Sequence, residues 1–429
     1  DPSATPLSPF YSQPDTFSPS KGTIWSASST VRRLPPQVRL MNILLAPDTS
    51  DHHNWGCRVM GEWYREKLDS NKEGGTLQAV GSKWFFQANP ELPELKSMDD
   101  FRRYADEVKA GRVLKGVAKV LQGRDVIFLN GENFIRPHTL KGRMLLFIAY
   151  LAKAIYDKPC ILSNHTVELT DDPALAEIVS EVYPLLDQVH FREQTSWDIA
   201  AHLVAEERRK MIPDVAWAVP AAPRTAWIDL AMRRGHFSAW PDSAENFNPA
   251  RPYVTLCASS IYSMPKYQNL DVVPVFWQLV KRLSEEVAPV LLTAPCIPEM
   301  KIMRQIHAKT RVPLLGSSLP VRQAIDLLGN AAVHVGGRWH LAIFAATGGT
   351  PLVAMGANNH KMHSLIRQLN LEEPIFDALA LEQHVDAIVS RARQHVDSGQ
   401  DLRQRILQRS RELGGQVESQ WSGGIRSFF

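Results

Sequence analysis

Residues 331–355 read AAVHVGGRWHLAIFAATGGTPLVAM, and this stretch decides the fold class. The apolar run AAVHV predicts a buried strand, and the glycine pair 336–337 after it predicts a tight turn. An apolar helix is expected from about residue 339 to a C-cap at the glycine pair 348–349, before a second buried strand, TPLVAM. Strand, helix and strand in this order are typical of a βαβ unit in a parallel sheet.

The same alternation of apolar runs and helical stretches continues along most of the chain. Strand-like runs in the first half are VRLMNILLAP (38–47), DVIFLN (125–130), PCILSN (159–164) and QVHF (188–191). Those in the second half include YVTLCAS (253–259), APVLLTAP (288–295) and VPLLGS (312–317). Helices are predicted between them, for example over 144–156, 273–286, 298–309 and 321–328. This pattern and the length of 429 residues predict two α/β domains in tandem.

Two segments interrupt this pattern. Residues 1–38 are rich in Ser, Pro and Thr, which predicts an irregular tail that cannot bury enough surface to offset its ordering entropy. Residues 220–252 hold five prolines and the polar stretch PDSAENFNPARP, which favours an interdomain linker or an elaborated loop. We therefore expect α/β domains at 39–219 and 253–395, followed by a closing helix and tail at 396–429.

Composition excludes several classes of protein. With 44% hydrophobic and 22% charged residues the chain is typical of a globular protein, and its net charge of +3 is too small to indicate nucleic-acid binding. The four cysteines lack CxxC spacing, so we predict reduced thiols rather than a disulfide framework or a zinc site. The adjacent side chains of His52 and His53 point in different directions, and we predict no metal.

No membrane-spanning segment is predicted. The longest apolar run, residues 144–156, is interrupted by Lys153 and falls short of the roughly 20 residues that cross a bilayer. The chain opens at Asp1 rather than at a methionine and shows no signal peptide. We expect a cytoplasmic protein with a trimmed N-terminus, and we leave open a peripheral contact with the inner face of the membrane.

The turn in the opening stretch holds the first candidate functional residues. Arg338 and His340 are expected at the N-terminus of the helix, where free N–H groups and a partial positive charge attract anions. The planar guanidinium of Arg338 suits a phosphate or a carboxylate. Two structural roles compete with this interpretation: Arg338 can pair with a neighbouring carboxylate, and His340 can be a capping residue.

The wider segment 331–361 resembles the C-terminal signature of the polysaccharide pyruvyltransferase family. That signature consists of Gly337, Arg338, His340, the helix LAIFAAT, Gly349-Thr350-Pro351 and Asn359-His360-Lys361. Four earlier segments resemble further motifs of the family: NWGC (54–57), DVIFLNGENF (125–134), HFREQTSWD (190–198) and IPDVAW (212–217). The resemblance covers about residues 41–370. The chain departs from the family pattern in its Ser/Pro tail, its Pro-rich insertion, and its NWGC and NGENF loops.

The resemblance implies a GT-B-like fold, with two Rossmann-like domains facing across a cleft. It also implies a transferase that moves pyruvate from phosphoenolpyruvate onto two hydroxyls of a sugar in a bacterial-type surface polysaccharide or glycan. The products are a cyclic ketal and phosphate. The domain at 253–395 is expected on the donor side and the domain at 39–219 on the acceptor side. Phosphoenolpyruvate is a co-substrate, no cofactor is expected, and the acceptor is a sugar or a lipid-linked glycan.

The resemblance also implies roles for particular residues. Arg338 and His340 are the catalytic candidates, and His340 can serve as acid, as base or as a donor to the leaving phosphate. The donor site is expected to contain Arg192, Arg338, Lys361, Gly337 and Asn359. The acceptor side or the cleft is expected to contain Asn54, Trp55, Gly56, Asn130, Glu132, His165 and Asp214. Replacing Arg338 or His340 by alanine is expected to abolish phosphate release while the protein stays folded.

Other interpretations stay open at this point. Each of these residues also has a possible structural role. Asn54 and Gly56 can form a turn, Arg192 can pair with Glu193 or another acid, and Asp214 can cap the structure that follows it. His165 can lie in a solvated loop, and Trp55 and Trp339 can pack in the interior. A GT-B glycosyltransferase would use the same architecture and hold a nucleotide sugar with Arg338 and Lys361. A third hypothesis, a catalytically silent sugar-binding or assembly subunit, is disfavoured by the set of basic residues and His340.

Overall fold

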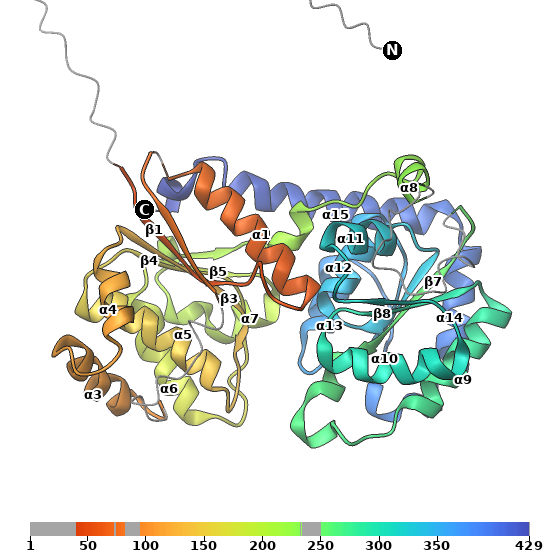
Figure 1. The fold of residues 1–429 in the computed structure, drawn as a ribbon, viewed down its shortest axis with the longest axis horizontal. Coiled ribbons are helices and arrows are strands. Elements are labelled where there is room, and N and C mark those ends of the chain that lie inside the picture. The colour runs from red at the N-terminus through yellow and green to blue at the C-terminus, as the bar shows by residue number, and fades with distance from the viewer. Residues whose placement is uncertain (1–39, 73, 82–94, 232, 234–249, 429) are drawn as a thin grey trace, which may run out of the picture. The chain divides into compact units, whose positions relative to one another are not determined.

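The computed structural model describes residues 40–72, 74–81, 95–231, 233 and 250–428. From Leu40 onward they belong to one compact unit that contains two six-stranded parallel sheets (Figure 1). The predicted α/β class with two Rossmann-like halves is confirmed. The predicted tail at 1–38 and most of the predicted insertion, residues 234–249, lie outside the described residues.

The first sheet has the strand order β2-β1-β3-β4-β5-β6. Its strands are β1 (Ile43–Asp48), β2 (Leu77–Gly81), β3 (Val126–Ile135), β4 (Cys160–Val167), β5 (Gln188–Phe191) and β6 (Arg209–Met211). Its helices are α1 (Trp55–Ser70), α3 (Met98–Lys109), α4 (Lys115–Gln122), α5 (Leu140–Tyr150), α6 (Pro173–Val182) and α7 (Gln194–Ala200). The expected helix over 144–156 is α5 followed by one π-helical turn, Leu151–Ile155.

Both faces of this sheet are covered, which is why its strands read as continuous apolar runs. Successive side chains of a strand point to opposite faces. Ile43 and Leu45 of β1 therefore belong to the core beneath α1, whereas Leu44 and Ala46 belong to the core shared with α3, α5 and α6. Figure 1 shows α1 on one side of the sheet and α5 and α6 on the other.

The second sheet has the strand order β12-β11-β10-β7-β8-β9. Its strands are β7 (Val254–Ser259), β8 (Val290–Ala294), β9 (Leu314–Gly316), β10 (Val333–Gly337), β11 (Leu352–Met355) and β12 (Ile375–Phe376). Its helices are α9 (Val273–Glu286), α10 (Ile297–Thr310), α11 (Val321–Gly329), α12 (Trp339–Thr347), α13 (Lys361–Gln368) and α14 (Val385–Asp397). β10, α12 and β11 form the βαβ unit expected from residues 331–355, with Gly348 as C-cap and a left-handed Gly349 at φ +80°.

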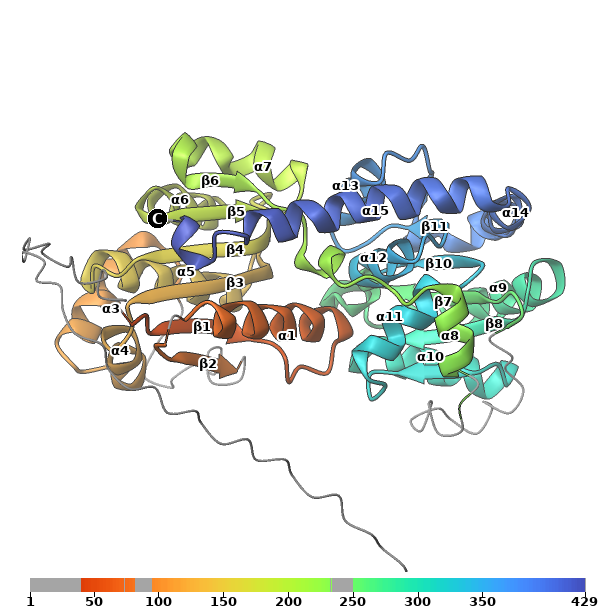
Figure 2. The ribbon, with the colours of Figure 1, turned by 90° about the horizontal axis from the view of Figure 1, so that it is seen from above.

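The last long helix, α15 (Gln400–Gln420), packs against both halves of the molecule. It contacts α12 of the second half and ends beside the first sheet, where Trp421 packs against Trp63 and Phe128 at ring-centroid distances of 5.4 and 5.6 Å. Figure 2 shows this helix lying along both halves. None of the helices in the described part of the chain is long and apolar enough to span a membrane.

Candidate active site

Polar residues from the carboxyl ends of both sheets line a cavity of about 220 Å³. The strand order reverses between β1 and β3 and again between β7 and β10, and open α/β sheets bind ligands at such points. The lining residues are Asn54, Cys57, Glu132, Asn133, Arg136, Arg192, Ser260, Ser263, Pro295, Arg338, Trp339, His340, Leu341, Asn358 and Lys361. Six residues predicted from the sequence are among them: Asn54, Glu132, Arg192, Arg338, His340 and Lys361.

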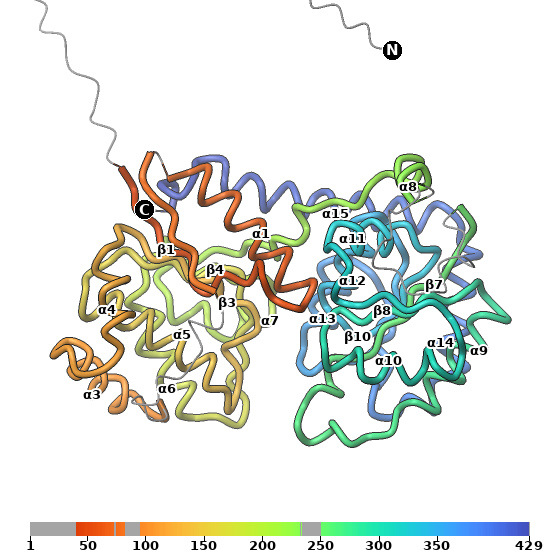
Figure 3. Tube along the Cα trace, in the orientation of Figure 1, coloured from red at the N-terminus to blue at the C-terminus, as the bar shows by residue number. Residues whose placement is uncertain are grey.

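Two glycines allow the backbone segments around this cavity to approach closely. A Cβ on Gly56 would lie 2.1 Å from Nδ1 of His340, so glycine at this point of α1 makes room for the imidazole. A Cβ on Gly337 would lie 2.7 Å from the carbonyl oxygen of Gly356. Asn54 caps α1 by accepting from the N–H of Gly56 at 3.0 Å. The N-terminal end of α1 thereby meets α11 and α12, as the trace in Figure 3 shows.

Arg338 precedes α12 and has a carboxylate partner. Its Nε forms an ion pair with Glu299, whose side chain is 1% exposed, and its Nη2 donates to Sγ of Cys296 at 3.0 Å. Both roles considered for Arg338 therefore apply: it pairs with a buried acid and it also lines the cavity. Burial raises the pKa of Glu299, and the neighbouring Arg338 opposes that shift.

Asp214 connects three of the site residues from beneath the cavity. Its fully buried carboxylate accepts from Nη1 of Arg192 at 2.8 Å and from Nε1 of Trp339 at 3.2 Å, and it lies 3.3 Å from Nε2 of His340. It also caps the segment that follows by accepting from Ala216 N–H. Burial opposes ionisation of Asp214, but His340 and Arg192 outweigh it and hold its pKa below the ordinary value. An ionised Asp214 thus orients both the imidazole and the guanidinium.

Lys361, at the first turn of α13, is the most unusual cation of the cavity. Its side chain is buried, and Nζ has no hydrogen-bond or ion-pair partner among the residues that the structure describes. Burial is the main cause that lowers its pKa from 10.5 to about 7, and the positive charges of Arg192, Arg338 and Arg136 lower it further. An ammonium group buried among guanidinium groups is costly unless an anion joins it.

Glu132 also lines the cavity and has two features that are typical of a functional residue. Its backbone is left-handed at φ +44°, a strained conformation for a residue with a side chain. Its Oε2 accepts from Sγ of Cys57 at 3.1 Å, while its buried Oε1 has no partner within the described part of the chain. A buried carboxylate oxygen without a partner is expected to accept a hydrogen bond from a ligand.

A second group of polar contacts joins the two halves beside the cavity. Glu193 accepts from Ser364 Oγ at 2.8 Å and lies 3.1 Å from Nε2 of His360. Burial raises the pKa of Glu193, but His360 and two serine hydroxyls reverse that effect and bring it to about 2. Asn359 donates to Asn133 at 3.0 Å. Arg192 and its neighbour Glu193 do not pair with each other. Arg192 pairs with Asp214, and Glu193 binds His360 and Ser364 of the second half.

Several residues predicted for the cleft do not line this cavity. His165 is a correction: it lies fully buried inside β4, bonded to His190 O and Tyr183 Oη, and burial lowers its pKa to about 3. Trp55 is also a correction, since it is buried and donates to Leu319 O in the core. Asn130 is buried near Thr49. Gly56, Gly337, Asn359 and Asp214 adjoin the cavity and support residues that line it.

The structure adds residues that the sequence analysis did not select, above all Arg136 and Cys57. Arg136 follows β3 directly and reaches the same cavity as Glu132 from that strand. The segment DVIFLNGENF (125–134), which resembles a family motif, ends two residues before Arg136 and could have indicated it. Glu299 had no such signal, because it lies on α10 and meets Arg338 only through the fold.

Comparisons of structure define the class to which this architecture belongs, the GT-B fold. α,α-Trehalose 6-phosphate synthase from Burkholderia multivorans is similar, with a TM-score of 0.55 and 12% identity over 90% of this chain and 98% of that one. An α,α-trehalose-phosphate synthase from Burkholderia xenovorans has a TM-score of 0.55 and 11% identity, with coverages of 91% and 100%. MnaA from S. aureus, solved with UDP, has a TM-score of 0.51 and 8% identity, with coverages of 89% and 96%. At these identities the likeness shows the fold alone.

The sequence itself then gives the family. Residues 35–359 match the family described as polysaccharide pyruvyl transferase, and the chain belongs to that family. The suspected family is thereby confirmed. A comparison with curated proteins finds no match.

Proposed function

We propose that the protein transfers pyruvate from phosphoenolpyruvate onto two hydroxyls of a sugar, forming a cyclic ketal and releasing phosphate. The observation that supports this most strongly is the set of cations around one cavity: Arg136, Arg192, Arg338 and Lys361. Arg192 and Arg338 have carboxylate partners, in Asp214 and Glu299. Arg136 and Lys361 have no ion pair within the described ranges, so the cavity holds positive charge that an anionic donor can neutralise.

Phosphoenolpyruvate suits this set because it carries a phosphate and a carboxylate on a three-carbon body. Guanidinium groups bind either anion with two parallel hydrogen bonds, and an ammonium acts as a point charge. The donor fills part of the cavity of about 220 Å³ and leaves the wall with Glu132 for the acceptor. The same cations stabilise the negative charge that builds up on phosphate as its bond to C2 breaks.

The reaction requires proton transfers, for which His340 and Glu132 of the cavity are our candidates. Protonation of the methylene carbon makes C2 electrophilic, and a sugar oxygen then adds to C2 as its hydroxyl proton is removed. Phosphate leaves, and the second hydroxyl adds to the same carbon and loses its proton. We assign the movement of one of these protons to His340, which Asp214 orients, and we expect the unpartnered Oε1 of Glu132 to accept a hydrogen bond from a sugar hydroxyl.

The proposal extends to the acceptor, to the location of the enzyme and to its need for a cofactor. We propose a glycan acceptor, free or lipid-linked, and a cytoplasmic enzyme that meets a lipid-linked acceptor at the inner face of the membrane. Phosphoenolpyruvate is the sole co-substrate, with no metal and no organic cofactor.

Donor identity is tested by a thermal-shift screen of the full chain. Phosphoenolpyruvate is expected to stabilise the protein by ~2.7 kcal/mol at a concentration 100 times its Kd. With a suitable glycan it is also expected to release inorganic phosphate. Stabilisation by UDP or a nucleotide sugar, without response to phosphoenolpyruvate, would establish the glycosyltransferase alternative instead. Glycan binding without turnover of any donor would establish a silent binding subunit.

The ammonium of Lys361 gives donor binding a pH dependence. Because its pKa lies near 7 instead of 10.5, the group is charged below about pH 7 and neutral above it. The KM for phosphoenolpyruvate is therefore expected to rise on the order of tenfold between pH 6 and pH 9. In Lys361→Arg the guanidinium stays charged, so its KM should vary less over this range. Equal pH profiles for KM in both proteins would refute a role of Lys361 in donor binding.

A further inference from the structure

A second cavity, of about 490 Å³, lies at the opposite end of the second sheet. Its lining includes Pro252, two residues before β7, and Ala332 and Pro351, which immediately precede β10 and β11, so it opens at the amino ends of these strands. The cavity of the candidate active site, called the catalytic cavity from here on, lies at the carboxyl ends of these strands. α12 begins at the catalytic cavity with Trp339 and ends at this one with Thr347. Nine helical residues separate the two by roughly 13 Å, and the two cavities have no lining residue in common.

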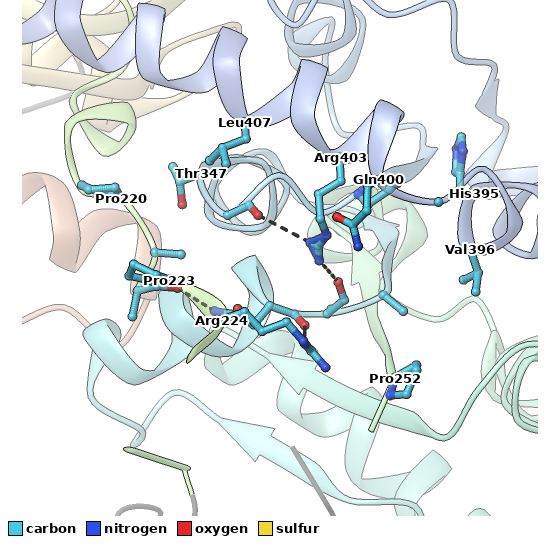
Figure 4. Close-up of a pocket in the computed structure, with 18 of the residues that line it drawn as sticks. Pro220, Pro223, Arg224, Pro252, Thr347, His395, Val396, Gln400, Arg403 and Leu407 are labelled. Atoms are coloured by element: carbon cyan, nitrogen blue, oxygen red, sulfur yellow. Dashed lines mark hydrogen bonds between the residues drawn. The ribbon is translucent and has the colours of Figure 1, made fainter. Parts of the chain in front are cut away.

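Three arginines line this cavity: Arg224, Arg403 and Arg411. Figure 4 shows Arg403 reaching into it from α15 and Arg224 from the first residue of α8 (Arg224–Ala231). No aspartate or glutamate is among the lining residues of the described part of the molecule. Three like charges without a carboxylate contrast with the catalytic cavity, where two of the four cations are paired.

The contacts of Arg224 and Arg403 hold these two side chains in place but do not neutralise them, and Arg411 lines the cavity from an exposed position of α15. Nη1 of Arg224 donates to the carbonyl oxygen of Asn330 at 3.1 Å, and Arg403 donates to the carbonyl oxygens of Ala331 and Gly348. Such carbonyls carry only partial negative charge, about half an elementary charge at a helix end. Burial lowers the pKa of Arg403, and the positive charge of Arg224 adds to this shift.

Nearby acids are engaged elsewhere. Asp326 accepts from the N–H of Ala222 at 2.8 Å and pairs with Arg322 at 3.0 Å, and it is not among the residues that line the cavity. His395, which also lines the cavity, lies 3.3 Å from Glu373 and 3.1 Å from Leu352 O. Neither contact reduces the positive charge of the three arginines.

The remaining walls are largely apolar. They consist of the proline-rich segment Pro220–Pro223, of Pro252, Ala331, Ala332 and Pro351, and of Val396 and Leu407. A volume of this size is in the range of small-molecule sites. We propose that this cavity binds an organic anion, a phosphate ester or phosphate-like group held by Arg224, Arg403 and Arg411 with its apolar body against the proline and alanine walls. The proposal does not depend on the reaction at the other cavity.

Calorimetric titration of the full chain with synthetic probes tests this site. 1-Naphthyl phosphate, which combines an apolar body with a dianion, is expected to bind at one site per chain, and more tightly than inorganic phosphate or 1-naphthol. Lys361→Gln, a change in the catalytic cavity, should leave this binding intact. In Arg224→Gln/Arg411→Gln the affinity should fall about tenfold, since two charge-assisted contacts are lost. Arg405→Gln, on an exposed position of α15 that does not line the cavity, is the matched control.

Two results would overturn the proposal. One is loss of 1-naphthyl phosphate binding in Lys361→Gln, which leaves the three arginines of this cavity intact and would place the probe in the catalytic cavity. The other is an affinity that is the same in the double variant, the control and the wild type. Arg403 is not substituted because it also donates hydrogen bonds to carbonyl groups at the ends of two helices. Its removal would affect the stability of the fold as well as ligand binding.

The anion can belong to a free metabolite or to a lipid headgroup, and a further arm separates these sources. Vesicles of phosphatidylcholine with phosphatidic acid are sedimented with the wild type and with the double variant. Co-sedimentation that requires Arg224 and Arg411 identifies a headgroup. Binding of 1-naphthyl phosphate without co-sedimentation identifies a free ligand.

Discussion

Replacing His340 by asparagine is expected to lower kcat for pyruvyl transfer by about 10²–10⁴-fold, the contribution usual for a group that moves a proton in the rate-determining step. His340 lines the cavity, and Asp214 orients its imidazole through Nε2. Asparagine keeps a polar side chain at the N-terminus of α12 but cannot take up and release a proton near neutral pH. The measurement is phosphate release under saturating phosphoenolpyruvate and glycan.

The fold should survive this change. Asp214 keeps its contacts with Arg192, Trp339 and the N–H of Ala216 when the imidazole is absent. The matched control is His363→Asn, an exposed histidine of α13, which should retain wild-type activity. A kcat within threefold of the wild type, in a folded His340→Asn protein that binds phosphoenolpyruvate, would refute the assignment of proton transfer to His340.

Replacing Arg338 by alanine is expected to destabilise the protein by about 3–5 kcal/mol as well as to weaken donor binding. The change leaves the Glu299 carboxyl buried without its partner, because this side chain is 1% exposed. The sequence led us to expect only that Arg338→Ala loses phosphate release while the protein stays folded; the buried pair with Glu299 adds a loss of stability to that expectation. Urea unfolding at equilibrium measures the difference.

The loss of stability should depend on pH with a definite sign. Without Arg338, burial holds the pKa of Glu299 above its unfolded value, so the folded state binds the proton more tightly. Stability is then retained at low pH and lost as the pH rises through the folded pKa, which makes Arg338→Ala closer to the wild type at pH 5 than at pH 8. An equal loss in the free energy of unfolding at pH 5 and at pH 8 would contradict the view that the variant leaves Glu299 buried and unpaired.

A double variant separates the two roles of Arg338. Glu299→Gln in the Arg338→Ala protein removes the unpaired carboxylate and should recover much of the stability but none of the donor affinity. Arg102→Ala serves as the control for loss of an arginine ion pair, because Arg102 is half exposed in its pairs with Asp99 and Glu181. Solvent screening makes such pairs weak, so this control should unfold like the wild type.

The sequence by itself determined the fold class and the position of the candidate site along the chain. Apolar runs that alternate with helical stretches predict parallel sheets, because only strands buried on both faces read this way. The glycines at 336–337 and 348–349 predicted the limits of α12, which runs from Trp339 to Thr347. Since polar residues after buried strands gather at one edge, Arg338 could be assigned to a site before any contact was known, whereas Glu132 was named from the resemblance to the family.

Tertiary structure alone decided the partners and the burial of these residues. His165 follows an apolar run in the sequence, but the register of β4 between β3 and β5 places it in the core instead of the cleft. Arg338 meets Glu299 across 39 positions, and Asp214 meets His340 across 126. Ion pairs and pKa shifts depend on distances of a few ångströms and on loss of solvent, which local sequence patterns do not encode. The order of residues thus determined where anions could bind, and the packing of the two sheets determined which cations remain unpaired to bind them.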